Sequence, residues 1–254
     1  MTKMMDNRFY KEIFRRRSFH RFPETGGPCL TQQELSEIEA AYETFEPLYP
    51  DIKTEIRIVP QSSTSGRRGG EYCILMYSEK KEGYLQNTGY LGEQLDLWLV
   101  SRNIGSLWLG LGKTEEKKLD GLDYVIMFLI GKVDPSQFRA EMSEAKRRPA
   151  EKIWEGDTLG IAETVRYAPS AVNSQPWYVV NNGEELTVCR YVAPGMRIIP
   201  TPLVSFYNLI DMGIFLAFLE ICLAEKGIEY RRELFPDAGG RTELSRTAVY
   251  RLLS

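Results

Sequence analysis

Two separated stretches of the sequence carry side chains of the kind that bind small ligands. Residues 16–22 (Arg-Arg-Ser-Phe-His-Arg-Phe) combine guanidinium groups with a hydroxyl, which suits a phosphate through charge-assisted and often bidentate hydrogen bonds. Residues 168–177 (Ala-Pro-Ser-Ala-Val-Asn-Ser-Gln-Pro-Trp) have a proline near each end, so the backbone there is irregular and leaves polar groups without regular partners. Each stretch also has an ordinary interpretation: an arginine run at a helix end, favoured by the helix dipole, and a helix-to-strand connector.

Several other chemistries lack the residues that they need. His20 is the single histidine, and the four cysteines form no Cys-x-x-Cys pair, so no metal site is predicted. Residues 110–114 (Gly-Leu-Gly-Lys-Thr) look like the end of a phosphate-binding loop, but the first glycine of that motif would fall at Leu107. No Gly-x-Ser-x-Gly elbow is present, and no Gly-x-Gly-x-x-Gly opens a βαβ unit. Hydrolase, nucleotide-triphosphate and Rossmann sites are therefore not predicted.

Composition and charge favour a soluble globular protein. The chain of 254 residues is 43% hydrophobic and 26% charged, with a formal net charge of −3, so no global basic field is available for nucleic acid or an anionic membrane. The most apolar segment, residues 209–224, is interrupted by Asp211 and Glu220, which argues against a membrane span. Residues 1–10 have no apolar signal core, and the scattered cysteines fit a reducing cytoplasm. We expect a cytoplasmic protein.

The first part of the chain, to residue 150, is predicted to alternate helices and strands. Thr31 and Glu34 have capping-box spacing, and residues 124–133 form a continuous apolar run typical of a buried central strand. The expected helices cover residues 7–17, a segment after Thr31, and 91–104, the last closed by Gly105. The expected strands cover residues 53–59, 71–77, 106–109 and 124–133. Residues 134–155 read as a connector rich in Pro, Lys, Arg and Glu.

After the connector the same order of elements recurs. We expect a helix at 158–167, strands at 177–181 and 185–191 joined by Asn182-Gly183, a helix at 207–226 ended by Gly227, and strands at 228–235 and 247–253. The sequence thus predicts an α+β fold, internally duplicated, with antiparallel-rich sheets flanked by helices. The halves would be residues 1–150 and 151–254, packed as an internal pseudo-dimer within a monomer. Two unrelated α+β domains are the alternative.

Together, the two polar stretches resemble the FMN-dependent nitroreductase family. Its members open with Arg-Arg-Ser-x-Arg-x-Phe and carry Ala-Pro-Ser-x-x-Asn-x-Gln-Pro-Trp after a later helix; residues 168–177 match every fixed position of the second motif. In the first motif, His20 stands where the family usually has Arg or Lys, with Arg21 beside it. Residues 103–110 and the basic run 146–148 are weaker matches. Because the arginine arm lies in the first half and the Pro-Ser segment in the second, the chain looks like a fused, single-chain form with one composite site.

The resemblance implies a nitroreductase-like fold and an FMN site held by Arg16, Arg17, Ser18, His20, Gly110, Leu111, Lys146, Arg148, Pro169, Ser170 and Asn173. Arg16 and Ser18 would bind the phosphate and ribityl chain, with charge added by Lys146 and Arg148. Gly110 and Leu111 would offer backbone N–H groups near flavin N5 and O4. The Pro169–Asn173 segment would contact the ring, and His20 or Arg21 would stand near N1 and O2, where positive charge stabilises a reduced flavin. Gln175 and Trp177 would be structural.

By the same resemblance, the expected activity is hydride transfer from NADH or NADPH to FMN and then to a small acceptor such as a nitroaromatic or quinone. The flavin would carry this chemistry, so no catalytic acid or base is expected from the protein. Two alternatives stay open. One is a non-catalytic or sensing flavin-binding module of the same fold, which the His20 departure motivates. The other is different FMN chemistry, such as reductive dehalogenation or flavin fragmentation.

Overall fold

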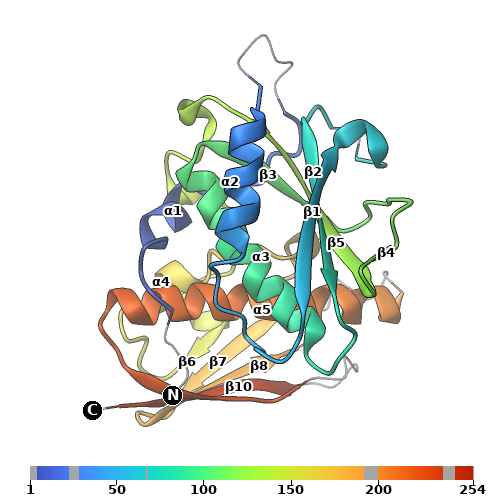
Figure 1. Cartoon of the computed structure of the whole chain (residues 1–254). Helices are drawn as coiled ribbons and strands as arrows, with labels where there is room; N and C mark the ends of the chain where they lie inside the picture. Colours follow the sequence, from blue (N-terminus) through green and yellow to red (C-terminus); the bar gives the residue numbers. More distant parts are fainter. Residues whose placement is uncertain (1–4, 23–28, 67, 192–199, 237–243, 254) are drawn as a thin grey trace.

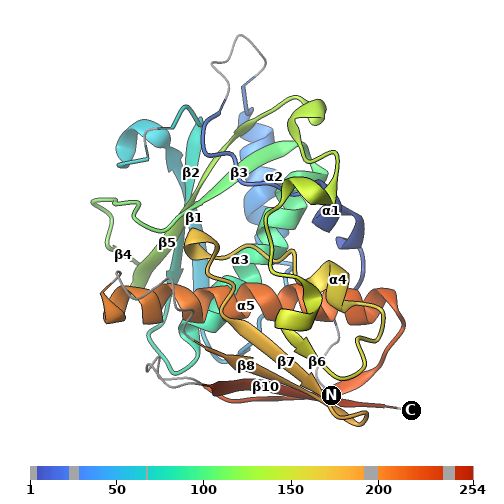
Figure 2. The ribbon, with the colours of Figure 1, turned by 180° about the vertical axis from the view of Figure 1, so that it is seen from behind.

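A computed structural model of the chain describes residues 5–22, 29–66, 68–191, 200–236 and 244–253. Two sheets lie at opposite ends of the molecule, and the two longest helices cross between them (Figures 1 and 2). The helices are α1 (Tyr10–Arg15), α2 (Gln32–Tyr42), α3 (Tyr84–Ser101), α4 (Ala162–Val165) and α5 (Thr201–Glu225). The strands are β1 (Thr54–Pro60), β2 (Tyr72–Ser78), β3 (Ile104–Leu109), β4 (Lys118–Leu119), β5 (Leu122–Lys132), β6 (Trp154–Glu155), β7 (Trp177–Asn181), β8 (Glu185–Arg190), β9 (Tyr230–Leu234) and β10 (Ser245–Leu252).

The first sheet is antiparallel, with strand order β1-β2-β5-β3 and β4 paired to β5. Alternate residues of β2 enter two different cores: Ile74 and Met76 face the core that contains α3, whereas Cys73 and Leu75 face a second core on the other side. Because β2 and β5 are covered on both faces, their sequences are continuously apolar. This confirms the buried central strand expected at residues 124–133.

The second sheet has the order β6-β7-β8-β10-β9, and within it only the short β6 pairs in parallel, with β7. Its strands β7-β8-β10-β9 repeat the order of β1-β2-β5-β3 when each set is counted along the chain, with a long helix after the second strand both times. The α+β class and the antiparallel-rich sheets are therefore confirmed. The repeated order supports an internal duplication, while a boundary near residue 150 stays a prediction.

The crossing of α3 and α5 depends on one glycine from each helix. A Cβ at Gly89 would overlap the carbonyl oxygen of Ile210, and a Cβ at Gly213 would overlap the carbonyl oxygen of Gln86. Each glycine thus meets the residue three positions before the other glycine, as an approximate two-fold axis requires. By length and composition α5 could cross a membrane, but 89% of its apolar window is buried inside the molecule, as in a core helix.

Several predicted boundaries moved, each for a physical reason. The capping box at Thr31 and the hairpin at Gly183 are confirmed. Helix α3 begins at Tyr84 instead of residue 91. Its first turns contain polar residues that are buried against α5, so the sequence there lacks the alternation of apolar and polar faces that marks a surface helix. Gly105 is not its C-cap: Asn103 takes the left-handed conformation there, with φ 56°, and Gly105 lies in β3. Helix α4 is shorter than expected, and the two-residue β6 lies within the predicted connector.

Candidate functional site

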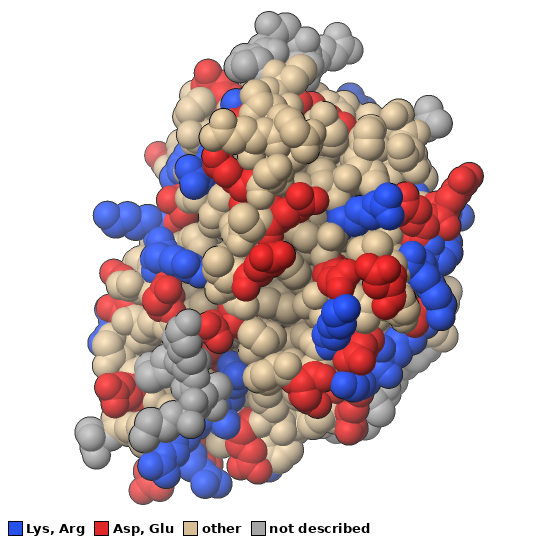
Figure 3. All heavy atoms as spheres, in the orientation of Figure 1, with Lys and Arg blue, Asp and Glu red and all other residues tan. Residues whose placement is uncertain are grey.

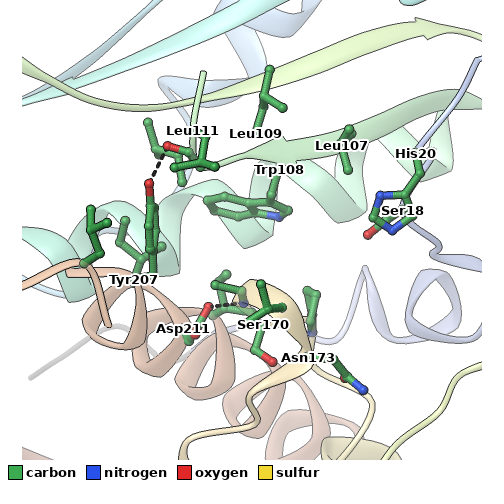
Figure 4. Close-up of a pocket in the computed structure, with 18 of the residues that line it drawn as sticks. Ser18, His20, Leu107, Trp108, Leu109, Leu111, Ser170, Asn173, Tyr207 and Asp211 are labelled. Atoms are coloured by element: carbon green, nitrogen blue, oxygen red, sulfur yellow. Dashed lines mark hydrogen bonds between the residues drawn. The ribbon is translucent and has the colours of Figure 1, made fainter. Parts of the chain in front are cut away.

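The two polar stretches meet at one cavity of about 640 Å³, although roughly 150 residues separate them in the sequence. Its walls come from the arm after α1, the end of β3 with the following turn, the segment after α4, and the first turns of α5 (Figure 4). The lining residues are Arg16, Ser18, His20, Arg68, Leu107, Trp108, Leu109, Gly110, Leu111, Ile126, Arg147, Pro169, Ser170, Ala171, Val172, Asn173, Leu203, Tyr207, Ile210, Asp211 and Ile214.

The arm that carries Ser18 and His20 is anchored by aromatic side chains. Phe19 and Phe22 are buried in the second core, where Phe19 also packs edge-on against Phe138. The Phe19 N–H donates to the Ser106 carbonyl at 2.9 Å, and Ser18 pairs with Ser106 as a parallel bridge. Phe19 and Phe22 therefore turn inward to the core, and the arm lies along the edge strand β3. This arrangement presents Ser18 and His20 to the cavity.

Arg16 lines the cavity but its charge is already engaged. Its side chain is 2% exposed, and Nε and Nη2 each lie 2.9 Å from Asp96 Oδ2 on α3. Asp96 also accepts from Trp108 Nε1 at 3.1 Å and from Ser106 Oγ. Burial opposes the charge on Arg16, but the nearby carboxylates of Asp96 and Glu93 together outweigh it and raise the pKa of the guanidinium. The network fixes the indole of Trp108, which forms part of the cavity wall (Figure 4).

The second stretch has a strained backbone at the cavity. Val172, Asn173 and Gln175 have positive φ of 47°, 57° and 48°, a left-handed conformation that is costly for a β-branched residue such as valine. Hydrogen bonds hold it: the Gln175 N–H donates to Ser170 Oγ at 2.9 Å, and Gln175 Oε1 accepts the Arg148 N–H at 2.8 Å. Trp177 is fully buried and stacks on Phe215. Gln175 therefore bonds the backbone and Trp177 lies in the core at the start of β7, the environments predicted for structural residues.

Asp211 on α5 holds this segment by hydrogen bonds. Its Oδ1 accepts the Ala171 N–H at 2.9 Å, and its Oδ2 lies 3.3 Å from Ser174 Oγ and 3.1 Å from Asn208 Nδ2. Burial raises the pKa of Asp211 to about 7, against the opposing effect of these three donors. The side chain rises from α5 toward the Ser170 segment (Figure 4). It is the one acidic residue among the described residues that line the cavity.

Gly110 and Leu111 form the turn after β3, at the cavity as expected. The Tyr207 hydroxyl donates to the Gly110 carbonyl at 2.6 Å, and a Cβ at Gly110 would lie 2.8 Å from the Tyr207 ring. The need for glycine here therefore has a cause within the chain, which is the close packing of Tyr207. Leu111 is 75% exposed at the mouth of the cavity.

Of the basic run 146–148, the structure brings the middle residue to the cavity. Arg147 Nη1 donates to Asn173 Oδ1 at 3.0 Å, and burial, followed by the nearby charge of Arg16, lowers the pKa of Arg147 to about 10. Lys146 is exposed and does not line the cavity; its carbonyl accepts from the Asn173 amide at 3.0 Å. Arg148 turns away to lie over the ring of Tyr191. Arg17 is also outside, donating to the Gln137 carbonyl at 3.1 Å.

The sequence interpretation did not select Arg68, Trp108, Arg147, Tyr207 or Asp211 as site residues. Asp211 had a usable signal, because an acid inside the most apolar segment of a chain needs a partner or a function. Arg68 lies beside the arm, where its Nη1 donates to the His20 carbonyl at 3.3 Å. Arg21 does not line the cavity.

Cationic side chains and exposed apolar side chains both line the cavity. Arg16, Arg68 and Arg147 are the cationic ones, and His20 of the arm lies in the lining with them. Leu111, Val172 and Leu203 are the exposed apolar ones, at 75%, 73% and 41% exposure. Exposed apolar side chains gathered around one cavity indicate a ligand with an apolar part.

Comparisons with known proteins identify the family and the fold of the chain. The family model described as "Putative TM nitroreductase" matches residues 8–223. A structure of a putative nitroreductase from Thermotoga maritima is similar over 99% of this chain and 96% of its own, with 20% identity and a TM-score of 0.62. A putative nitroreductase from Desulfovibrio desulfuricans, solved in complex with FMN, covers 60% of this chain and 99% of its own, with 17% identity and a TM-score of 0.43. No curated protein matches the chain.

The family match spans most of the sequence, so the fold and the site belong to a nitroreductase-like protein. The chain is a member of the "Putative TM nitroreductase" family. The resemblance inferred from residues 16–22 and 168–177 is thereby confirmed, as is the nitroreductase-like fold.

Proposed function

We propose that the chain is a flavin-dependent oxidoreductase that binds FMN in the cavity and passes hydride from NADH or NADPH to a small acceptor. One observation carries the proposal: the arm that follows α1 and the Pro-Ser segment converge on a single cavity lined by both cationic and exposed apolar side chains. Family membership supports the oxidoreductase class.

The residues present fit FMN in kind. The cavity volume lies in the range of small-ligand sites, roughly 300–1,000 Å³. FMN has an anionic phosphate and a largely apolar ring, so the cationic and the apolar side chains of the lining complement its two parts. Arg147 and Arg68, with Ser18, would hold the phosphate and ribityl chain. Because Asp96 already neutralises Arg16, Arg16 would act mainly through its place in the wall.

Further roles follow from the positions of the remaining residues. The Pro169–Asn173 segment and the Gly110–Leu111 turn would enclose the ring from opposite sides, while His20 would offer ring nitrogens to its polar edge. When bound, FMN would supply reversible hydride chemistry, which the protein itself lacks. The protein would position the reactants and exclude water. An apolar acceptor such as a quinone or nitroaromatic would suit the rim formed by Leu111, Val172 and Leu203.

We extend the proposal to the whole chain as a cytoplasmic monomer with one site, formed between two duplicated halves. The strand orders and the symmetric glycine crossing support the duplication. On the face shown in Figure 3, acidic and basic side chains are interspersed, which fits a protein without a nucleic-acid or membrane partner. The non-catalytic flavin module, motivated by His20, is the competing function.

An absorbance scan of the purified protein, with and without added FMN, tests cofactor binding directly. We expect protein-bound flavin bands with a shifted maximum. Rapid mixing with NADH and NADPH in separate anaerobic runs should then bleach those bands. Absence of flavin bands after FMN addition would refute the proposal. Binding without bleaching by either nucleotide would favour the non-catalytic module.

A further inference from the structure

Asp211 is a buried acid that lines the cavity and whose carboxylate holds backbone of the cavity wall. Its residue is 3% exposed, and its carboxylate accepts from Ala171, Ser174 and Asn208. The bond to the Ala171 N–H fixes the segment just before the strained Val172. A first explanation of Asp211 is therefore structural, as a support for the cavity wall.

The first half of the chain shows that this support needs no charge. Asn87 on α3 accepts the Tyr49 N–H through Oδ1 at 2.9 Å. Asn87 lies two residues before Gly89, and Asp211 lies two residues before Gly213, so the two side chains occupy matching places at the helix crossing. Both hold a backbone N–H in the loop that precedes the first long strand of their sheet. A neutral amide performs the task in the half that contributes no such segment to the cavity.

Ionisation of Asp211 moreover lowers the stability of the fold. Burial raises the pKa of Asp211 to about 7, whereas an aspartate in an unfolded chain has a pKa of about 3.9. Since the folded pKa is the higher one, the stabilising effect of the bound proton is complete below about pH 4 and is lost as pH rises through about 7. The chain thus keeps an acid where an amide could hold the Ala171 N–H.

Other titratable and charged groups around Asp211 do not account for this pKa. Tyr207 is on the same helix, and Arg16, His20, Arg68 and Arg147 are the other charged or titratable residues in the cavity lining. Beside the crossing, α3 carries the uncharged Gln86, Asn87 and Thr88. Burial raises the pKa of Asp211, and the three hydrogen-bond donors lower it in part. The acid is therefore held half-protonated near neutral pH by its place in the wall.

We propose that Asp211 is the proton donor of the cavity and protonates an oxygen atom of the acceptor as that acceptor is reduced. The inference rests on the proposed function. A quinone becomes a hydroquinone by gaining one hydride and one proton. The hydride comes from NADH or NADPH by way of the cofactor. The proton leaves the Asp211 carboxyl group, whose O–H bond breaks as the new O–H bond forms, and solvent water returns a proton to the carboxylate afterwards.

Both protonation states of Asp211 have hydrogen-bond partners. The carboxylate accepts from the Ser174 hydroxyl, and the neutral acid can donate to the same oxygen, because a hydroxyl serves as donor or acceptor. The Ala171 N–H donates to Oδ1 in either state. The wall segment therefore keeps its anchor while the proton is exchanged.

The first experiment measures how the stability of the flavin-free protein depends on the protonation of Asp211. Thermal unfolding of the apoprotein is followed from pH 5 to 9 for wild type, Asp211→Asn and the reciprocal variant Asn87→Asp. We expect the melting temperature of wild type to fall across pH 6–8 relative to Asp211→Asn, and Asn87→Asp to add a second loss of the same sign. The same pH dependence in wild type and Asp211→Asn would overturn the proposal.

The second experiment measures proton delivery. Holoprotein is loaded with FMN, reduced with one equivalent of NADH or NADPH, and mixed rapidly with 1,4-benzoquinone at each pH. We expect the oxidation rate of wild type to fall above pH 7, and that of Asp211→Asn to be lower by roughly 10²-fold near pH 6 and flat. Asp211→Glu should recover a falling profile, and Asn87→Asp should match wild type. Equal rates and profiles in wild type and Asp211→Asn would overturn the proposal.

The two experiments separate the proton donor from the proposed function. If wild type takes up no FMN or is not reduced by either nucleotide, the proposed function fails, and with it the donor role. A normal flavin cycle with unchanged oxidation of Asp211→Asn removes the donor role alone.

Discussion

At the scale of single residues, neighbouring arginines in the arm have unlike environments. The guanidinium of Arg16 lies 2.9 Å from Asp96 in the interior, and both side chains are almost fully buried. Arg17, the next residue, is exposed and donates to a surface carbonyl. Loss of one partner of a buried ion pair leaves the other charge without compensation, whereas exposed pairs contribute little.

Arg16→Ala should therefore lower the free energy of unfolding by about 3–5 kcal/mol. The matched variant Arg17→Ala should change it by about 0.5 kcal/mol or less. Urea unfolding of the apoprotein measures both. Similar losses in the two variants would show that the Asp96 pair does not stabilise the fold.

The basic run 146–148 offers a second comparison of neighbours, this time for ligand binding. Arg147→Ala should weaken FMN binding by about 1.5–3 kcal/mol, since it removes a charged hydrogen-bond donor from the cavity. Lys146→Ala should change affinity by about two-fold at most, because Lys146 is outside the cavity. Flavin fluorescence titration gives both constants, and melting temperatures check that the fold is retained. A stronger effect of Lys146→Ala than of Arg147→Ala would mean that the FMN phosphate binds at Lys146 instead.

This run also shows where prediction from sequence stops. A basic cluster near the site was visible, but residues 141–152 have no helical or strand period, so the sequence could not tell which side chain turns inward. The Arg16–Asp96 pair was hidden for another reason: 80 residues separate its partners. By contrast, residues 168–177 were identifiable because two prolines and four polar side chains lie in one short stretch.

At the scale of elements, the crossing of α3 and α5 is the tightest contact between the two halves. A methyl group at Gly213 would meet the backbone of Gln86, which cannot turn aside as a flexible side chain can. The fold pattern was predictable from apolar periodicity. The close approach was not, because a glycine in a helix reveals no partner.

Gly213→Ala should lower the free energy of unfolding by at least about 1–3 kcal/mol, as overpacked cores do, although alanine is the better helix former. Ser36→Ala in the exposed face of α2 should change it by about 0.5 kcal/mol or less. Thermal or urea unfolding gives the comparison. Stabilisation by Gly213→Ala would mean that the helices can separate there without cost.

At the scale of the whole molecule, the two halves contribute different parts of one cavity. The arm belongs to the first half and the Pro-Ser segment to the second. The place in the first half that corresponds to Tyr207 is Gly83, and the ring of Tyr49 packs directly against it. At matching places of the two halves, Tyr207 thus lines the cavity in the second half, whereas the ring of Tyr49 occupies the space beside Gly83 in the first.

We expect one FMN per chain at saturation. Isothermal titration calorimetry of the apoprotein, with the protein concentration fixed by amino-acid analysis, measures the ratio. A ratio of two would contradict a single composite site and would require a second cavity in the first half.

The covalent link between the halves changes how the site responds to dilution. A site built between separate subunits is lost as they dissociate, so its occupancy falls with protein concentration as well as with ligand concentration. Here both walls belong to one chain, so the residues between β5 and α4 hold them at a fixed effective concentration. Occupancy of the proposed FMN site would then depend on free FMN alone. Such a protein would keep FMN bound at low copy number, where a two-chain site would come apart.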